Sequence, residues 1–468
     1  MASIKKAVEM LQRAKDGPAC TQKEWDYKVI PETNRKYLKK FELEGTYNPK
    51  TPVNQDPELA DRFFEAGMEM AEEIGLLFTD TESRIKVSRT EILQAMSDAS
   101  DHLVLGEGRD QIVLRARRPE DKIPPIFTGP LCIQVSEDLF VPIASGILAS
   151  RKVHMQEGPS IDTVYGKPVY SGSPFETAVG IREVELKREA MLRAGRPGMP
   201  QMGCCSSTTE YGNLGGFHLM NSRHNRAIAV CLNPSELKTN MTTFHKLIHA
   251  IGCDAYLNCG GAYAMIGGYS GGPEGCVLTN IATDLLFYTV LQADCSASAI
   301  YDMRFDSSCS RAAIWANSTA TQAKARNSNM MDYTLVNQLA GPCTEEILYT
   351  SAAGSIATAV SGIAFQIGPR TAGGRFKNYL TPLEHWFMAE VFDASAQLNL
   401  SKANDLVNYL LSTYEDGLKD PPEGQSYIDC FDLKTGLPSK EWVAIADKVA
   451  ADMRAHGLPM DDPVVCRK

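Results

Sequence analysis

The sequence predicts an α/β protein built on a (β/α)8 barrel, with a helical N-terminal extension before the barrel and further helices after it. Short apolar runs recur eight times between residues 123 and 382, roughly 30 to 40 residues apart, which is the length of a strand–helix unit. Helical patterns occupy several of the gaps, and eight such units are what a closed parallel barrel needs. A doubly wound open sheet is the alternative. The first run is not followed by a G-x-G-x-x-G motif, which argues against its dinucleotide-binding form.

Residues 1–122 are expected to form the helical extension. Apolar side chains at helical spacing predict a helix over 60–74. Ser88 is placed to cap a second helix that runs through 91–96. The run 112–117 has the composition of a strand between two turns.

The barrel is expected over residues 123–382. The predicted strands are 125–128, 161–165, 199–202, 228–232, 255–257, 297–303, 334–339 and 365–367. The predicted helices between them are 137–148, 176–193, 235–251, 280–291 and 345–360. In such a barrel the carboxyl ends of the strands form the mouth that carries the active site. Residues 383–468 are expected to add helices over 383–414 and 442–456, with a loop at 420–424 between them.

The composition limits the kinds of partner. The chain has 468 residues, 44% of them hydrophobic, and a formal net charge of −10. An acidic protein is not expected to bind nucleic acid or an anionic membrane as its main partner. The N-terminus has no apolar run typical of a signal peptide, and no stretch approaches the roughly 20 apolar residues that span a bilayer. We therefore expect a cytoplasmic protein with no membrane or nucleic-acid partner.

No metal site is expected from the cysteines and histidines. The 13 cysteines form no C-x-x-C pair, and their odd number does not suggest a disulfide framework. His245 and His249 have the spacing of two zinc ligands on one helix face. Lys246 stands where a zinc peptidase needs glutamate, however, and no third ligand follows.

A candidate site is built around residues 195–203, Gly-Arg-Pro-Gly-Met-Pro-Gln-Met-Gly. The stretch begins where a charged helical pattern stops. Pro197 has no backbone donor, and Gly195 and Gly203 tolerate backbone angles that are closed to other residues. We therefore expect a tight loop and then a short strand, whose end would face the barrel mouth.

The motif Gly-Arg-Pro-Gly-Met at 195–199 resembles the segment that leads to the pyrrolysine of the corrinoid-dependent monomethylamine methyltransferases. Further segments resemble that family in the same order along the chain: 20–26, 105–110, 136–142, 166–176, 267–272, 340–345 and 430–435. On these residues the chain is identified as a member of the family that itself lacks the pyrrolysine. Met202 stands three residues after the methionine of the motif, where the family has pyrrolysine.

The resemblance implies a barrel, a homo-oligomer (a hexamer by analogy), and transfer of a methyl group from a small methylated amine to the Co(I) of a separate corrinoid protein. It also implies that this chain binds no cofactor covalently, since the partner supplies the corrinoid. The sequence departs from the family pattern near the expected chemistry. Gly261 replaces an acidic residue, and Leu335, Val336 and Asn337 replace a Gln-Tyr-Tyr run.

The predicted strand register places the candidate site residues at the mouth. The catalytic candidates are Met202, Asn337 and Gln338. The substrate-binding candidates are Asn258, Tyr263, Tyr269, Arg304, Glu345 and Glu384. Aromatic faces and carboxylates suit a cation, and an arginine suits the carboxylate of a betaine-type substrate. The alternatives are that the tyrosines only pack the rim and that Arg304 forms an ion pair with Asp302 or Asp306.

Met202 has no electrophilic carbon that could bind an amine as the pyrrolysine imine does. We therefore expect Met202 to form a wall of the substrate pocket. The substrate would carry a permanently positive nitrogen, as in a quaternary ammonium ion, because its amine is then a better leaving group. Two other functions stay open: a barrel lyase or hydrolase with a new acid/base pair, and a non-catalytic relative that binds a ligand.

Overall fold

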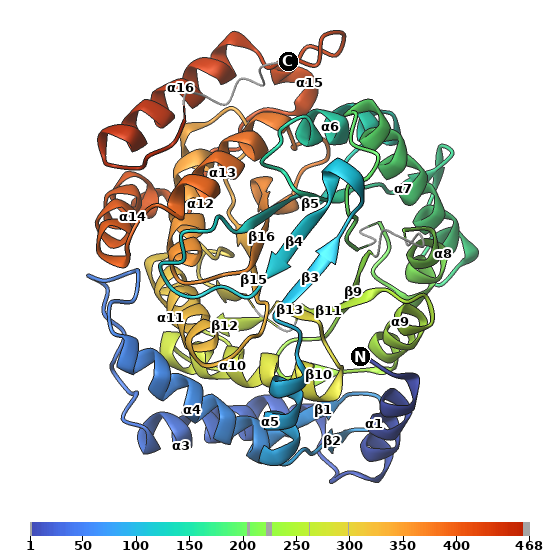
Figure 1. The fold of residues 1–468 in the computed structure, drawn as a ribbon, viewed down its shortest axis with the longest axis vertical. Helices are drawn as coiled ribbons and strands as arrows, with labels where there is room; N and C mark the ends of the chain where they lie inside the picture. The colour runs from blue at the N-terminus through green and yellow to red at the C-terminus, as the bar shows by residue number, and fades with distance from the viewer. Residues whose placement is uncertain (1, 204–205, 221–226, 262, 298, 462–468) are drawn as a thin grey trace.

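In the described part of the chain, eight parallel segments form a closed ring (Figure 1). The computed structural model describes residues 2–203, 206–220, 227–261, 263–297 and 299–461. The segments are β5 (Ile126–Gln134), β6 (Met155–Ser160), residues 201–202, β9 (Ile228–Leu232), β11 (Tyr256–Gly260), β13 (Cys295–Ala297), β15 (Tyr333–Asn337) and β16 (Phe365–Arg370). They pair in this order, and β16 pairs with β5 to close the ring. The predicted (β/α)8 barrel is confirmed.

Two predicted strands differ from the observed ones. The second strand of the ring is 155–160, so the prediction of 161–165 is wrong. Ile161 and Val164 are apolar because the loop after the strand is buried against α7, and Val164 forms a small hairpin there, β7 (Thr163–Val164) with β8 (Lys167–Pro168). The run 297–303 is divided. Its first residue ends β13, whereas β14 (Ile300–Asp302) pairs with β12 (Ala264–Ile266) in a separate two-stranded sheet.

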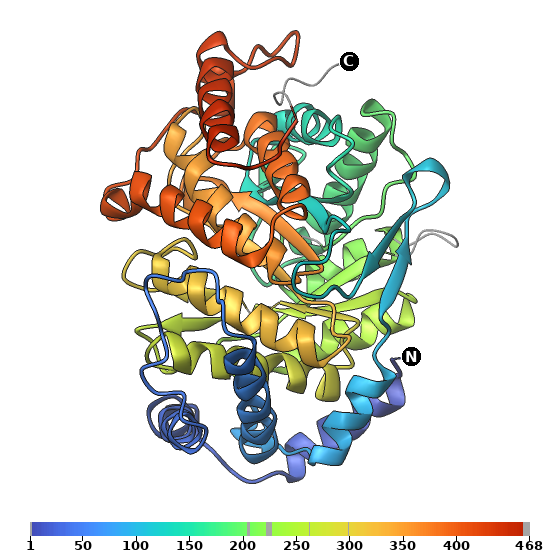
Figure 2. The same ribbon diagram turned by 60° about the vertical axis from the view of Figure 1, so that its left-hand side comes forward.

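Helices cover the outside of the ring (Figure 2). They are α6 (Glu137–Leu148), α7 (Pro174–Arg193), α8 (Glu210–Met220), α9 (Met241–Gly252), α10 (Pro273–Val290), α11 (Arg311–Asn327) and α12 (Glu345–Val360). α11 is not among the helices that the sequence pattern predicts. This helix is rich in alanine, serine and threonine and packs against α4, α10 and α12, so most of its side chains are buried and no polar face marks it.

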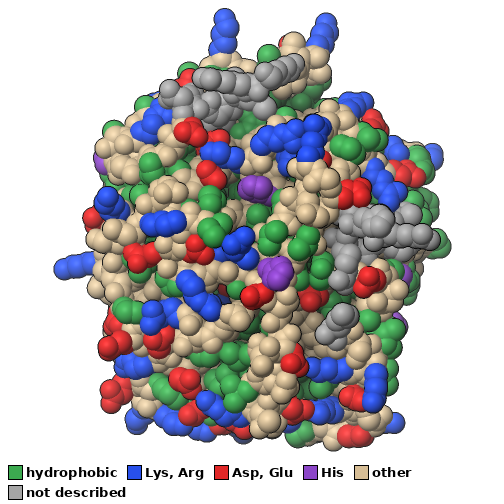
Figure 3. Space-filling model, in the orientation of Figure 1, with side chains coloured by type: hydrophobic (Ala, Val, Ile, Leu, Met, Phe, Trp, Pro, Cys, Tyr) green, Lys and Arg blue, Asp and Glu red, His purple; other side chains and the backbone are tan. Residues whose placement is uncertain are grey.

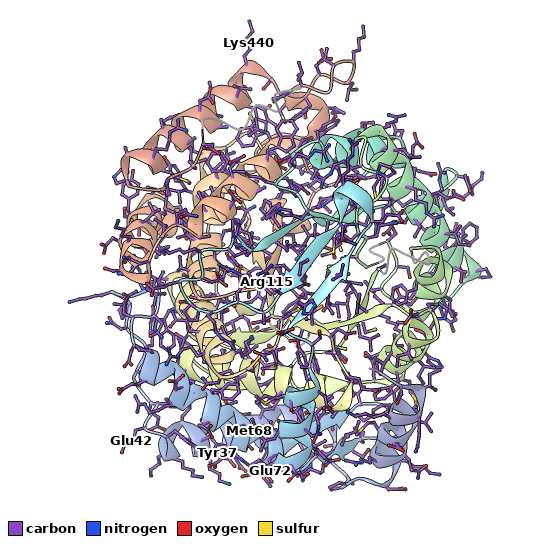
Figure 4. The ribbon with its side chains drawn as sticks, viewed as in Figure 1. Tyr37, Glu42, Met68, Glu72, Arg115 and Lys440 are labelled. Carbon is purple, nitrogen blue, oxygen red and sulfur yellow. The ribbon has the colours of Figure 1, made fainter. Side chains whose placement is uncertain are left out.

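The N-terminal extension contains α1 (Ile4–Asp16), α2 (Gln22–Glu24), a π-helical turn (Trp25–Val29), α3 (Ile30–Lys40), α4 (Pro57–Ile74), β1 (Leu76–Phe78), β2 (Ser83–Ile85) and α5 (Arg89–Asp98). The predicted cap is confirmed, because the Ser88 side chain accepts from Glu91 N and the Glu91 carboxylate accepts from Ser88 N. β1 also pairs with β10 (Lys238–Thr239), which ties the extension to the loop after β9. Figure 4 shows Tyr37, Met68 and Glu72 together on these helices.

A hairpin of β3 (His102–Leu105) and β4 (Ile112–Arg115) lies across the ring in Figure 1. Its buried leucines pack against residues at the amino-terminal ends of the ring strands, such as Met155 and Phe365. The hairpin therefore closes the amino-terminal end of the barrel and leaves the other end as the mouth. On the face that carries the hairpin, positive and negative side chains are interspersed (Figure 3), and Figure 4 shows Arg115 in front of the ring.

The C-terminal region begins with a short 3-10 turn (Thr371–Gly374) and contains α13 (Pro382–Ser395), α14 (Leu400–Tyr414), a 3-10 turn (Glu415–Gly417), α15 (Tyr427–Cys430) and α16 (Lys440–Ala455). The predicted helix 383–414 breaks before Leu400, where the Asn399 side chain caps α14. α13 packs against α6 and α12, and both α14 and α16 pack against α12. Among the described residues, no helix has the length and apolar character that crossing a bilayer requires.

Candidate functional site

The side chain of Met202 packs inside the barrel. It is fully buried and belongs to an apolar cluster inside the barrel, here called the inner cluster. Successive side chains of each ring strand point alternately into this cluster and toward the outside of the ring. On β9, for example, Ile228 and Val230 belong to the inner cluster, whereas Ala229 and Cys231 face the helices. Met202 is bridged to Ile228 and therefore shares its inward direction.

A carboxylate that the sequence analysis missed lies beside this methionine. Glu157 on β6 is 4% exposed. Its Oε1 atom is 3.8 Å from Cys132 Sγ on β5. A Cβ atom on Gly203, the residue after Met202, would lie 3.7 Å from the same oxygen. Glu157 therefore places a carboxyl group next to the end of the third ring segment.

Several tyrosine rings pack on the same inner cluster as this part of the barrel. Tyr263 and Tyr301 have ring centroids 4.9 Å apart and are tilted by 59°. Burial raises the pKa of Tyr263, and the Cys132 and Glu157 side chains raise it further while Arg370 opposes them. Burial also raises the pKa of Tyr333 well above its usual value, with Tyr263 and Glu157 adding to the effect. These phenols therefore stay neutral at physiological pH and present aromatic rings to the barrel interior.

Asn258 adds an amide to the same interior. It lies on β11 two residues after Tyr256, which packs on the inner cluster, so its side chain points inward. The residue is fully buried, and its amide interacts with the Tyr333 phenol on β15, which leaves it capacity for further hydrogen bonds. A buried amide of this kind is suited to bind a ligand or a water molecule, because leaving that capacity unused is unfavourable.

Asn337 and Gln338, the other two catalytic candidates, hold loops at the mouth. The Asn337 amide donates to the main-chain oxygen of Asp306 (2.7 Å) and accepts from Arg370 Nη1 (3.3 Å). Gln338 Nε2 donates to the main-chain oxygen of Arg370 (3.3 Å). Both side chains are buried at the end of β15 and hold Arg370, the last residue of β16, beside the tyrosines.

Four predicted substrate-binding residues lie elsewhere. Tyr269 packs edge-on against Tyr27 of the extension, with ring centroids 5.3 Å apart. Arg304 forms the ion pair named as the alternative: its Nε and Nη2 donate to Asp302 at 2.8 and 2.6 Å. Glu345 pairs with Lys448 on α16, and Glu384 is buried in the N-terminal cap of α13 with Thr381. The structure brings together Met202, Asn258 and Tyr263 but does not bring these four to them.

A polar cavity of about 360 Å³ opens beside the mouth. Its lining includes the ends of β5 and β6 and the start of α7: Gln134, Ser160, Ile161, Asp162, Val169, Ser171, Glu176 and Ser206. Ser206 follows the third ring segment closely, so the cavity borders the candidate site. Among the described residues, no group of three histidine, cysteine or acidic side chains is arranged to hold a metal ion.

Comparisons with known proteins agree over nearly the whole chain. Residues 6–458 match the family described as monomethylamine methyltransferase MtmB. MtmB3 of Methanosarcina barkeri is 30% identical over 461 residues, which cover 96% of this chain and 97% of the relative. MtmB of Methanosarcina mazei is 28% identical over 457 residues with the same coverage of both chains.

Solved structures give the same result. The crystal structure of Methanosarcina barkeri MtmB superposes with a TM-score of 0.91 at 27% identity and covers 97% of this chain and 98% of that chain. The crystal structure of a hydroxylamine complex of MtmB has the same values. The chain therefore belongs to the monomethylamine methyltransferase MtmB family and is a methyltransferase.

Proposed function

We propose that this protein transfers a methyl group from a methylated amine to the Co(I) of a corrinoid carried by a separate protein. Membership of the MtmB family supports this activity, because the relatives carry the name of monomethylamine methyltransferases. The architecture supports it too, since the barrel is closed at one end by the β3–β4 hairpin and has its candidate site at the other. The corrinoid protein would dock over that mouth, and the enzyme would act as a homo-oligomer, a hexamer by family analogy.

Within this proposal Met202 stands at the pyrrolysine position and forms a wall of the substrate pocket. Two observations support the assignment: the Gly-Arg-Pro-Gly-Met motif three residues earlier, and the burial of Met202 in the inner cluster at the end of the third ring segment. A thioether cannot form a covalent adduct with an amine. Orientation of the substrate must then come from non-covalent groups.

The substrate that fits such a site is a quaternary ammonium ion. The observations that carry this choice are the buried Glu157 side chain next to the end of the Met202 segment and the Tyr263–Tyr301 ring pair that packs on the same inner cluster. Aromatic faces and a carboxylate attract a desolvated cation. Neutral methylamine would have to expel an amide anion when its methyl group is transferred, whereas a quaternary ammonium ion is positive at every pH and always expels a neutral amine.

The reaction then balances without a proton transfer. The reduced corrinoid supplies the nucleophile that accepts the methyl group. The carbon–nitrogen bond breaks with both electrons going to nitrogen, so a neutral tertiary amine leaves. Glu157 and the tyrosines hold the cation in the ground state, and the fixed position of Arg370 and Asn337 keeps the mouth in shape for the acceptor.

The test is methyl transfer to a reduced corrinoid protein from a panel of N-methyl compounds, followed by the corrinoid absorption spectrum. The wild-type chain is expected to react with a quaternary ammonium compound. Glu157→Gln keeps the side-chain volume and removes the charge, so kcat/KM should fall at least tenfold, which corresponds to about 1.4 kcal/mol.

The matched control is Glu65→Gln on α4, an exposed glutamate of the extension. It should react as the wild type does. If no compound in the panel transferred a methyl group, the proposed activity would be excluded. Transfer from methylamine but from no quaternary compound would retain the activity and overturn the substrate class.

A further inference from the structure

Two charged residues of α7 hold the chain on both sides of residues 204–205. The Lys187 ammonium donates to the main-chain oxygens of Met202 (3.3 Å) and Gly203 (3.2 Å). The Glu183 carboxylate accepts from the main-chain N–H of Ser206 at 2.6 Å. The two side chains pair with each other at 2.7 Å, and both are fully buried. We call Glu183 and Lys187 the α7 clamp.

The backbone is shaped to fit this clamp. Successive carbonyl groups of an extended strand point in opposite directions, so one ammonium ion does not normally reach both. Gly203 has φ +63°, which turns its carbonyl toward the same ammonium as that of Met202. The lysine stem reaches this point by passing Gly158 on β6, where a Cβ atom would lie 2.5 Å from Lys187 Cε.

The neighbouring strands alone hold this segment weakly. Residues 201–202 are joined to β6 and β9 by single bridges, Gln156–Gln201 and Met202–Ile228. Four backbone bonds join the segment to these strands: the N–H groups of Met202 and Gly203 donate to Gln156 and Ile228, and the N–H groups of Gln156 and Ile228 donate to Pro200 and Gln201. The carbonyl oxygens of Met202 and Gly203 accept from Lys187. The third segment is therefore fixed by α7 in addition to its short ladders.

Stability alone does not account for the clamp. Removing two ions from water costs free energy, and well-packed apolar residues often replace a buried ion pair without loss of stability. What an apolar pair cannot do is bind two carbonyls and an N–H group at once. We propose that Glu183 and Lys187 are positioning residues that fix the Met202 side chain in the substrate pocket. This inference rests on the proposed function, in which Met202 is a wall of that pocket.

The decisive variant is the double substitution Glu183→Gln with Lys187→Met, because it removes both charges and leaves no orphaned ion in the interior. The probe is the ε-methyl signal of Met202 in ¹³C-methyl-methionine NMR, assigned with Met202→Leu among the 18 methionines. We expect this signal to shift or broaden, and kcat for methyl transfer to fall at least tenfold. The single variant Lys187→Arg keeps a buried donor, so it should retain more of the wild-type kcat than the double variant does.

The matched control is Lys238→Met, a buried lysine that pairs with Asp26 of the extension at 2.6 Å. It should lower the melting temperature but leave the Met202 signal and kcat unchanged. An unchanged Met202 signal in the folded double variant would overturn the clamp proposal, whatever the activity. A wild-type protein that transferred no methyl group would instead refute the proposed function. The NMR comparison of wild type and double variant would still show whether the clamp fixes the Met202 side chain.

Discussion

At the residue scale, Glu157 shows how an error in one predicted strand position leaves a candidate functional group unrecognised. The apolar run 161–165 predicts the second strand there, which leaves residue 157 in the preceding loop. In the structure the strand is 155–160, and its glutamate faces the interior, which is why this strand does not read as an apolar run. A charged residue in a short segment next to a predicted strand was the signal that could have found it.

A second buried glutamate makes stability depend on pH. Burial raises the pKa of Glu384 to about 8 from an ordinary value of 4.5. The folded state therefore favours the protonated acid, and its stabilising effect is complete below about pH 4.5 and is lost as the pH rises toward 8. Between these two pH values the free energy of unfolding should fall by up to about 1.4 kcal/mol per pH unit because of this residue.

Glu384→Gln should remove this dependence. Glutamine imitates the protonated acid and can keep the cap with Thr381. The variant should be more stable than the wild type at pH 8, and the difference should shrink toward pH 5, as measured by urea denaturation at several pH values. Glu9→Gln, at an exposed site on α1, should show no such trend. A difference that grew toward low pH would contradict the assignment.

At the element scale, the β3–β4 hairpin is the floor of the barrel. Its strands alternate between a face in the inner cluster and a face in solvent, so neighbouring residues have opposite roles. The sequence predicted the strand 112–117 but not what it covers. The partner surface consists of strand ends that are far apart in the chain, so no local pattern reveals it.

Leu114→Ala should therefore destabilise the protein strongly. Leu114 is fully buried in the inner cluster, and a cavity there should cost about 2–5 kcal/mol of unfolding free energy. The neighbouring variant Val113→Ala removes a side chain from a residue that is 41% exposed and should change stability by no more than about 0.5 kcal/mol. Equal losses for the two variants in chemical denaturation would mean that the hairpin does not close the barrel.

Elements with polar and apolar faces were predictable, and those buried on all sides were not. Ser88 and Glu91 identified α5 because a capping box is a local feature. α11 was not predictable because its small side chains are covered by helices on several sides. Such a helix lacks the periodic alternation of apolar and polar residues by which a helix is recognised in a sequence.

At the scale of the whole molecule, Arg117 joins the chain before the first strand to the chain before the last strand. The guanidinium donates to the main-chain oxygens of Ala359 (2.9 Å) and Ile363 (2.8 Å), and to those of Asp121 (3.0 Å) and Ile123 (3.1 Å). Burial lowers its pKa to about 10, so it stays charged at pH 7. It therefore supports ring closure between β16 and β5.

Arg117→Met should cost at least about 3 kcal/mol, because it leaves several buried carbonyl groups without a donor. The expected result is a lower denaturation midpoint in guanidinium chloride. Arg115→Met, at an exposed position of the hairpin, should be neutral within about 0.5 kcal/mol. A wild-type midpoint for the Arg117 variant would show that ring closure does not need this residue.

The sequence by itself determined the fold class, most of the helices and the family, since the spacing of strand–helix units and the order of the motifs are properties of the chain. It also singled out Met202, Asn258 and Tyr263, which the structure brings into one interior. Only the tertiary structure decided that Tyr269, Arg304, Glu345 and Glu384 lie apart from them and that Glu157, Lys187 and Glu183 surround the third segment. The reason is physical: spacing along a chain sets which residues share a strand or helix face, whereas contacts between elements depend on how the barrel closes.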